Sequence, residues 1–172
     1  MQVETLVALP ALSIRQPWAS YVIAGLKSLE LRDWSTSYRG WLWIHAGRTL
    51  DVEALATAGI ASRDFRTGGL LGIARLVACA PIASAAQWQA LRNEHRSPGT
   101  FTRGTYAWTF EDTVALDEKI DALGALRLYR LDDGTRAEIA RQLAQTAAQA
   151  EFTDAVRAIP EPDATSLRGP SA

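Results

Sequence analysis

The stretch LSIRQPWASYVIAGLKSLELRDW, from Leu12 to Trp34, mixes apolar residues with several strongly polar ones. Within it, Lys27, Glu30 and Arg32 lie close together in the chain. An ammonium and a guanidinium can bind phosphate or carbonyl oxygens, while a carboxylate between them orients both or accepts a proton. The same spacing also fits a solvated strand face, where an ion pair stabilises the fold by well under about 1 kcal/mol.

Tryptophans form a second group of candidate ligand-binding residues. Trp34, Trp41 and Trp43 are close in sequence, and strand alternation places Trp41, Trp43 and His45 on one face. An exposed ring can stack on a base, which contributes about 1–3 kcal/mol. Because tryptophan is bulky and mostly buried, we expect this face to pack under a helix. We interpret His45 as a hydrogen-bonded structural residue, with a ligand-facing donor or proton shuttle as the alternative.

Other reactive residue types form no recognisable pattern. Ser13, Ser20 and Ser28 have no convincing histidine or aspartate partner in the sequence, which also lacks a nucleophile elbow, a Walker loop and a dinucleotide fingerprint. The single cysteine, Cys79, is expected to be a small buried hydrophobe. Two histidines and one cysteine far apart do not match a zinc-ligand pattern. We therefore expect neither a metal nor a cofactor.

Composition limits the classes of function. The chain has 172 residues, 48% of them apolar, and a net charge of −1. It is long enough for one domain with its own core, but no global field attracts polyanions, so nucleic-acid binding must depend on a local patch. No apolar run reaches the roughly 20 residues of a membrane-spanning helix. The N-terminus lacks the basic region of a signal peptide, and we expect a soluble cytoplasmic protein.

Local patterns predict the elements that position the polar residues. A strand over 12–16 leads into a helix over 17–24, which begins at a proline and ends before a glycine. Residues 28–34 alternate strictly, so Glu30 and Arg32 share one strand face. Further strands are predicted over 41–46, 70–82, 106–110, 114–116 and 126–131. Further helices are predicted over 51–58, with Asp51 or Thr49 as its cap, and over 84–93 and 135–150.

This order of elements predicts a small α+β domain. The helices are too few and too short for the crossovers of a doubly wound parallel sheet. A curled or closed barrel surrounded by helices fits better, because closure removes exposed strand edges. We divide the chain into a domain over 1–133, a C-terminal helix over 134–152 packed on or beside it, and a tail over 153–172 that we expect to be disordered.

Five segments, in this order, resemble the ASCH domain family, which is named for homology to activating signal cointegrator 1. The resemblance covers about residues 12–131. Its most specific parts are the Gln-Pro-Trp start of the first helix, the motif Gly25-x-Lys27-x-x-Glu30-x-Arg32, and the strand Trp43-Ile44-His45-Ala46. The five segments are LSIRQPWASYVIAGLKSLELRDW, RGWLWIHAG, GGLLGIARLVAC, YAWTFEDTVAL and GALRLYRL.

The resemblance implies a fold and a site. The fold is a PUA-like β-barrel of about five to six mostly antiparallel strands, with short surrounding helices and a C-terminal helix. A cleft at the barrel is lined by the residues that follow the first helix. The residues expected to bind a nucleic acid or other ligand are Gln16, Trp18, Lys27, Glu30, Arg32, Trp43 and His45.

By analogy with related RNA-binding domains, the resemblance implies a partner that is RNA or a nucleoside. One single-stranded or modified base would enter the cleft, stack on a ring and be recognised by its edge. On this hypothesis, Glu30→Gln is expected to alter ligand handling with little loss of folding.

The alternative is a small hydrolase that uses the same cleft, with Lys27 and Glu30 as catalytic residues. Some small bacterial ASCH proteins resemble amidohydrolases of acylated cytidine, in which a threonine stands at the place of Glu30. That hydroxyl is missing here, so the mechanism does not transfer intact. A ribonuclease would use Lys27, Glu30 and His45 to exchange protons. A purely protein-binding role is the third hypothesis.

Overall fold

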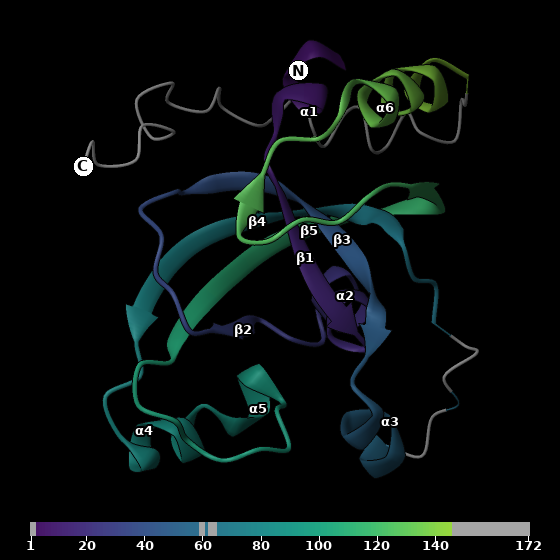
Figure 1. Ribbon diagram of the computed structural model, residues 1–172. Coiled ribbons are helices and arrows are strands. Elements are labelled where there is room, and N and C mark those ends of the chain that lie inside the picture. The colour runs from purple at the N-terminus through teal and green to yellow at the C-terminus, as the bar shows by residue number, and fades with distance from the viewer. Residues whose placement is uncertain (1–2, 59–60, 62–64, 146–172) are drawn as a thin grey trace.

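The alternating and apolar stretches of the sequence form six strands in the computed structural model, which describes residues 3–58, 61 and 65–145 (Figure 1). The strands are β1 Ala11–Gln16, β2 Leu29–Arg32, β3 Gly40–Leu50, β4 Gly69–Pro81, β5 Tyr106–Asp121 and β6 Leu128–Tyr129. They form one sheet in the order β2-β5-β4-β3-β1-β6. β1 pairs with β3 in parallel, and the other pairings are antiparallel. The predicted α+β class and mostly antiparallel sheet are confirmed.

Short helices surround this sheet, as the sequence predicts. The predicted helix after the first strand is present and begins after Pro17, while Gly25 follows it with a left-handed φ of 70° that favours glycine. The predicted C-terminal helix begins at residue 133, and its expected last part, 146–152, and the tail lie outside the described residues. The helices are α1 Val3–Ala8, α2 Trp18–Ile23, α3 Val52–Ala58, α4 Ala85–Ala90, α5 Arg92–His95 and α6 Asp133–Gln145.

The sheet curls into a half-closed barrel because its longest strands, β4 and β5, are irregular. Their register shifts three times along the pairing, and each irregularity bends the strand that carries it. At Gly72 the two backbones are so close that a Cβ atom would lie 2.2 Å from the Val114 carbonyl oxygen. A glycine there allows the close approach. The two strands predicted over 106–110 and 114–116 are therefore parts of one bent strand.

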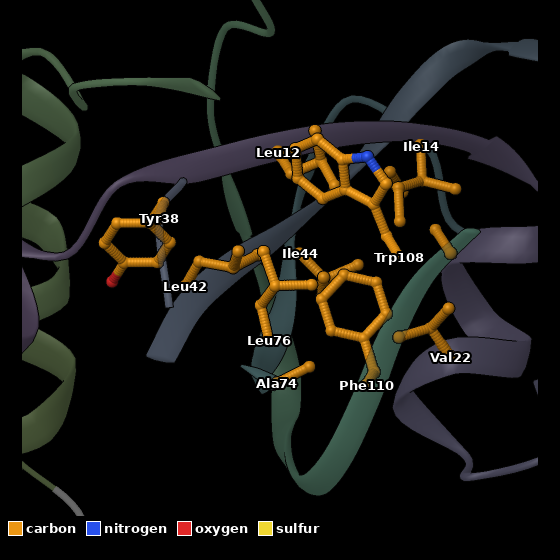
Figure 2. Packing of buried hydrophobic residues seen from close by; sticks show 12 residues of the cluster. Leu12, Ile14, Val22, Tyr38, Leu42, Ile44, Ala74, Leu76, Trp108 and Phe110 are labelled. Carbon is orange, nitrogen blue, oxygen red and sulfur yellow. The ribbon is translucent and has the colours of Figure 1, made fainter. Parts of the chain in front are cut away.

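Both faces of the sheet are buried. The concave face packs under α2, and its residues include Leu12, Leu42 and Trp108 (Figure 2). The opposite face, which carries Trp41 and Trp43, packs against residues of α1 and α6, and these two helices lie side by side in Figure 1. The prediction that the tryptophan face packs under a helix is confirmed, although α1 itself has no counterpart among the predicted elements.

Smaller departures from the predictions follow from local geometry. The last strand has only two residues, Leu128 and Tyr129, because β6 pairs with β1 at only two positions. The helix predicted over 84–93 divides into α4 and α5. Cys79 is half-buried rather than buried, because it lies near the end of β4. None of the helices in the described part of the chain is both long and apolar enough to cross a membrane.

Candidate ligand-binding site

A hollow of about 240 Å³ lies where β2 and β1 face each other across the open side of the half-barrel. These two strands are not neighbours in the sheet, yet the Arg32 Nη2 atom donates a hydrogen bond to the Ser13 carbonyl oxygen at 2.7 Å. We call this site the seam hollow. It is lined by Arg15, Trp18, Lys27, Glu30, Leu31, Arg32, Asp51 and Ser97.

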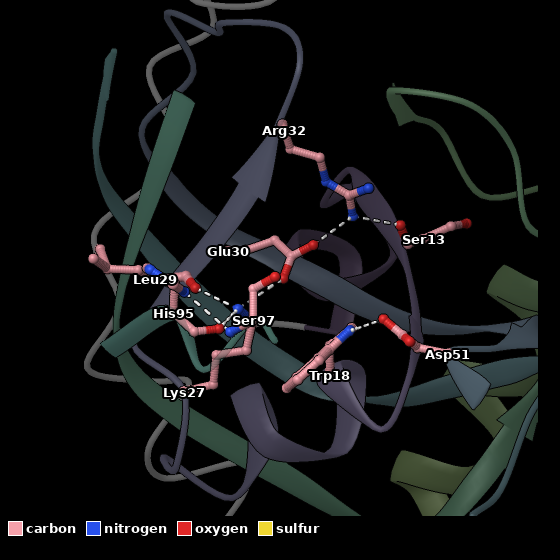
Figure 3. Close-up of polar contacts among 9 residues, drawn as sticks. All are labelled: Ser13, Trp18, Lys27, Leu29, Glu30, Arg32, Asp51, His95 and Ser97. Atoms are coloured by element: carbon pink, nitrogen blue, oxygen red, sulfur yellow. Dashed lines mark hydrogen bonds and ion pairs between the residues drawn. The ribbon is translucent and has the colours of Figure 1, made fainter. Parts of the chain in front are cut away.

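Glu30 is the central charge of the seam hollow. Its Oε2 atom lies 3.5 Å from Lys27 Nζ, and its Oε1 atom lies 3.4 Å from Arg32 Nη2 (Figure 3). Glu30 is only 6% exposed, so water screens these two contacts little. The carboxylate therefore holds both cations in place.

Lys27 is a buried ammonium that joins three segments. Its Nζ atom donates to the Leu29 carbonyl oxygen at 2.6 Å and makes a short hydrogen bond to the His95 carbonyl oxygen. It also lies 5.1 Å from the centre of the Trp18 ring. Burial lowers the pKa of Lys27, and the nearby carboxylate of Glu30 opposes this effect. With two carbonyls and one carboxylate as partners, all three donors of the ammonium are engaged.

The ring of Trp18 is held in a fixed orientation at the hollow. Its Nε1 atom donates to Asp51 Oδ2 at 2.8 Å (Figure 3). The other oxygen of Asp51 accepts from the Ala54 amide at 3.1 Å and thereby caps α3, as predicted for this aspartate. One carboxylate thus connects the start of α3 to the aromatic wall of the hollow.

Among the described residues, this site has one buried N–H group without a hydrogen-bond acceptor and two arginines without a carboxylate partner. The Nε atom of Arg32 is buried and has no hydrogen-bond partner among the described residues. A buried donor of this kind is normally satisfied by a partner, so an acceptor in the hollow would complete it. Arg15 on the lining and Arg96 near Lys27 are both exposed. No carboxylate of the described residues forms an ion pair with either of them.

Four of the seven predicted binding residues, Trp18, Lys27, Glu30 and Arg32, line the seam hollow. Gln16 does not, because it is fully buried: its Nε2 atom donates to the Arg66 carbonyl oxygen and its Oε1 atom accepts from the Ser20 amide. These bonds fix the start of α2 and the chain around residue 66.

Trp43 and His45 also lie away from the hollow. Trp43 is fully buried, and its Nε1 atom donates to the Leu6 carbonyl oxygen of α1 at 2.9 Å. The sequence predicts that this strand face packs under a helix, but it does not identify α1 as that helix. His45 is 2% exposed and contacts Ser13 and Ala122. The expectation that Ser13 lacks a histidine partner is therefore wrong.

Three polar lining residues were not predicted for the site. Asp51 was predicted only as a helix cap, and its second role depends on the packing of α3 beside Trp18. Arg15 follows from strand alternation, since it lies two residues after Ser13 on the same face of β1. Ser97 comes from the loop after α5, and no local pattern marks it.

Comparison with known proteins gives a match over most of the chain. The family model of the ASCH domain matches residues 12–123. Activating signal cointegrator 1 of Mus musculus is 35% identical over 80 residues, which are 40% of this chain and 14% of the mouse protein. The protein of the same name from Homo sapiens is 54% identical over 35 residues, 20% of this chain and 6% of the human protein. The chain thus spans a small part of the length of these curated relatives.

Solved structures share the fold. The crystal structure of ASCH from Zymomonas mobilis has a TM-score of 0.53 at 16% identity, with 80% of this chain and 96% of that chain covered. A tyrosine-to-phenylalanine mutant of the same Zymomonas mobilis protein has a TM-score of 0.54 at 15% identity, with 78% and 97% covered. At such low identity the likeness concerns the fold alone, and it confirms the predicted ASCH-type barrel.

Proposed function

The chain belongs to the ASCH domain family, and from this premise we propose that it binds single-stranded RNA or a nucleoside by accepting one unpaired base in the seam hollow. One observation carries the proposal. A ring of fixed orientation, a carboxylate and a guanidinium with a buried unpaired donor line the same small hollow. This combination offers a surface on which a base can stack. The carboxylate can accept hydrogen bonds from the base edge, and the guanidinium can donate to it.

The size of the hollow supports a single base rather than a larger ligand. Its volume of about 240 Å³ lies below the range of roughly 300–1,000 Å³ that is usual for pockets of drug-sized ligands. The Trp18 ring forms one wall, and stacking on such a ring contributes about 1–3 kcal/mol per base. Because Asp51 already orients the ring, stacking requires little additional ordering of the side chain.

Polar groups of the hollow suit recognition of a base edge. Glu30 is an acceptor for an amino or imino group, while the Nε–H group of Arg32 is a donor for a ring nitrogen or carbonyl oxygen. Arg15 on the lining and Arg96 near Lys27 supply the local positive charge that the net charge of −1 does not provide. Phosphates on either side of the inserted base are their expected partners.

Binding is better supported than turnover at this site. A catalytic lysine needs a free amine or a mobile proton, whereas Lys27 Nζ is bound to two carbonyls and a carboxylate. Glu30 is similarly shared between two cations. Proton transfer by either group would first require these contacts to break.

Fluorescence anisotropy of a labelled, unstructured RNA oligonucleotide, titrated at several salt concentrations, tests the proposal. Trp18→Leu is expected to weaken binding by about 1–3 kcal/mol, or roughly 5- to 150-fold, while Trp18→Phe retains a stacking ring and most of the affinity. Arg15→Gln is expected to reduce the slope of log affinity against log salt by about 0.7, the value for one lost contact to a single-stranded phosphate.

Arg75→Gln is the matched control, because Arg75 is a half-exposed arginine of β4, in the middle of the sheet. It is expected to leave affinity and salt slope almost unchanged. The proposal fails if wild-type protein does not bind the RNA at low salt. It also fails if Arg15→Gln and Arg75→Gln have equal effects, since binding would then not depend on the seam hollow.

A further inference from the structure

A second polar cluster contains the side chain of Ser13, the β1 residue whose carbonyl oxygen accepts from Arg32 at the seam hollow. Ser13 Oγ is 3.0 Å from His45 Nδ1, and His45 Nε2 is 3.2 Å from the Ala122 carbonyl oxygen. The parallel pairing of β1 with β3 places Ser13 and His45 directly opposite each other. A hydroxyl within hydrogen-bond reach of an imidazole, itself oriented by a third group, is the arrangement of an activated nucleophile.

The partners of His45 determine where its proton lies. A carbonyl oxygen only accepts hydrogen bonds, so Nε2 carries the hydrogen and donates it to Ala122. In the neutral ring, Nδ1 is then an acceptor and receives the hydroxyl hydrogen of Ser13. Burial lowers the pKa of His45. The hydrogen bond to Ala122 opposes this effect, and the charges of Lys119 and Arg48 add to it. The base is therefore neutral, and ready to accept a proton, at neutral pH.

This pair opens onto a pocket of about 400 Å³, which we call the serine–histidine pocket. At its mouth, Leu123 and Leu126 are 71% and 92% exposed, an unusual position for large apolar side chains. Arg48 is exposed and has no carboxylate partner among the described residues. The pocket is lined by Ser13, His45, Gly47, Arg48, Gly68, Ala122, Leu123, Gly124, Ala125 and Leu126.

Gly124 leaves room beside the pair. A Cβ atom at this position would lie 2.8 Å from Ser13 Oγ and 2.6 Å from His45 Cε1. Both distances are shorter than ordinary contacts, so a side chain here would fill the space next to the hydroxyl. The bare backbone of Gly124 thus keeps the approach to Ser13 open from the pocket.

We propose that Ser13 and His45 form a nucleophile–base pair that hydrolyses small acyl esters carrying an anionic group. This activity is independent of RNA binding in the seam hollow. The acyl part packs against Leu123 and Leu126, and the anionic part binds Arg48. The geometry favours acyl transfer over cleavage of RNA, because the pocket mouth is apolar where a polynucleotide would need positive charge.

The reaction has two balanced steps. Ser13 Oγ attacks the ester carbonyl carbon while its proton passes to His45 Nδ1, and the C–O bond to the alcohol breaks as that proton moves to the departing oxygen. The product is an acyl ester of Ser13 and a free alcohol. Water then attacks the acyl carbon, gives a proton to His45 Nδ1 and releases the acid, after which the proton returns to Ser13 Oγ.

Tyr129 of β6 is the hydroxyl nearest to the reacting oxygen. Its Oη atom lies 3.4 Å from Ser13 Oγ, and the Ala125 amide also forms a hydrogen bond with it. The Ser13 hydroxyl donates either to Tyr129 Oη or to His45 Nδ1, and only the second orientation prepares it for attack.

The first test combines active-site labelling with a matched pair of substrates. A fluorophosphonate probe is expected to label wild-type protein on Ser13, as mapped by mass spectrometry. We expect 4-acetoxybenzoate to be hydrolysed at least 5-fold faster than its neutral methyl ester, and Arg48→Gln to remove this preference. The rate is expected to increase with pH and level off above a midpoint below 6.5, because His45 faces Arg48, Lys119 and Tyr129 and must be neutral.

Ser13→Ala is expected to abolish labelling and hydrolysis. Ser28→Ala, which changes a serine directly before β2, is expected to leave both unchanged. Thermal unfolding of each variant distinguishes a loss of activity from a loss of folding. Mapping of the labelled residue is done on the wild-type protein and so does not depend on the folding of any variant. The proposal is overturned if labelling occurs elsewhere, or if ester hydrolysis does not exceed the buffer rate. Cleavage of labelled RNA that depends on Ser13, without ester turnover, would also overturn it.

Discussion

The seam hollow and the serine–histidine pocket meet at one residue of β1 but hold their polar groups in different ways. In the seam hollow, the Ser13 carbonyl oxygen accepts from Arg32, which shares the Glu30 carboxylate with Lys27. In the serine–histidine pocket, the Ser13 hydroxyl contacts a neutral imidazole. Paired charges resist proton transfer because a group that gains or loses a proton becomes neutral, and the attraction to its charged partner is then lost. A neutral hydroxyl–imidazole pair has no such constraint.

This difference separates the expected roles of the two regions. The ion pairs of the seam hollow hold β2, α2 and the end of α5 in place, so they should contribute to stability as well as to ligand binding. Ser13 and His45 are held by strand pairing, and their side chains should be far less important for folding. Mutations in the seam hollow should therefore lower the free energy of unfolding, whereas mutations of Ser13 or His45 should mainly lower ester hydrolysis.

The largest loss of stability is expected for Lys27→Met. The change removes a buried ammonium and leaves the Glu30 carboxylate and two carbonyl oxygens without this donor. Removing one partner of a buried ion pair typically costs about 3–5 kcal/mol. Urea denaturation measures the free energy of unfolding, with Arg75→Gln as the control for loss of a solvent-accessible cation. A loss as small as in the control would mean that Lys27 does not hold these segments together.

A smaller loss, about 1–3 kcal/mol, is expected for Glu30→Gln. The amide keeps the shape of the side chain but leaves two cations without their carboxylate. Sequence alone predicts little loss of folding, and the burial of Glu30 at 6% exposure changes that expectation. Denaturation and RNA titration of the same sample distinguish the two roles. Unchanged stability with altered binding would restore the original prediction.

Gly124→Ala tests the serine–histidine pocket alone. The added methyl group would contact Ser13 and His45 at less than 3 Å, and overpacking of this size is expected to cost about 1–2 kcal/mol. Labelling of Ser13 should be lost, while RNA affinity stays unchanged. Gly99→Ala is the control, because its Cβ atom would lie 3.6 Å from Ser97 Oγ, an ordinary contact. Equal behaviour of both variants would show that Gly124 does not keep the approach open.

The smallest effect is that of pH on stability. Burial lowers the pKa of both His45 and His95 below the ordinary value of 6.5, so the unfolded chain binds more protons than the folded one at mildly acidic pH. The free energy of unfolding should be greatest above about pH 6.5 and decrease as the pH falls below it. Each histidine contributes at most about 1.4 kcal/mol per pH unit.

Urea denaturation at pH 7.5 and 5.5 measures this dependence, and His45→Gln is expected to reduce it. The result would contradict the assignment of a neutral His45 if stability increased toward pH 5.5, or if the variant and the wild-type protein had the same pH dependence.

Much of the seam hollow could be predicted from the sequence because its key residues are neighbours in the chain. The spacing of Lys27, Glu30 and Arg32 on a short strand, directly after a helix, already places three charges together. The position of Trp43 depends on a distant segment instead. Alternation predicts that its strand face packs under a helix, but that helix, α1, is a separate segment more than 30 residues away.

The sequence by itself determined the local elements, the class of the fold, the family and the close association of the three charges, because periodicity and short-range spacing depend on neighbouring residues. Only the tertiary structure decided which charges are buried and which residues from distant segments face them. The His95 carbonyl that binds Lys27 lies 68 residues away, and His45 lies 32 residues from Ser13. Such pairs depend on the register between strands and the packing of helices, which local patterns do not specify.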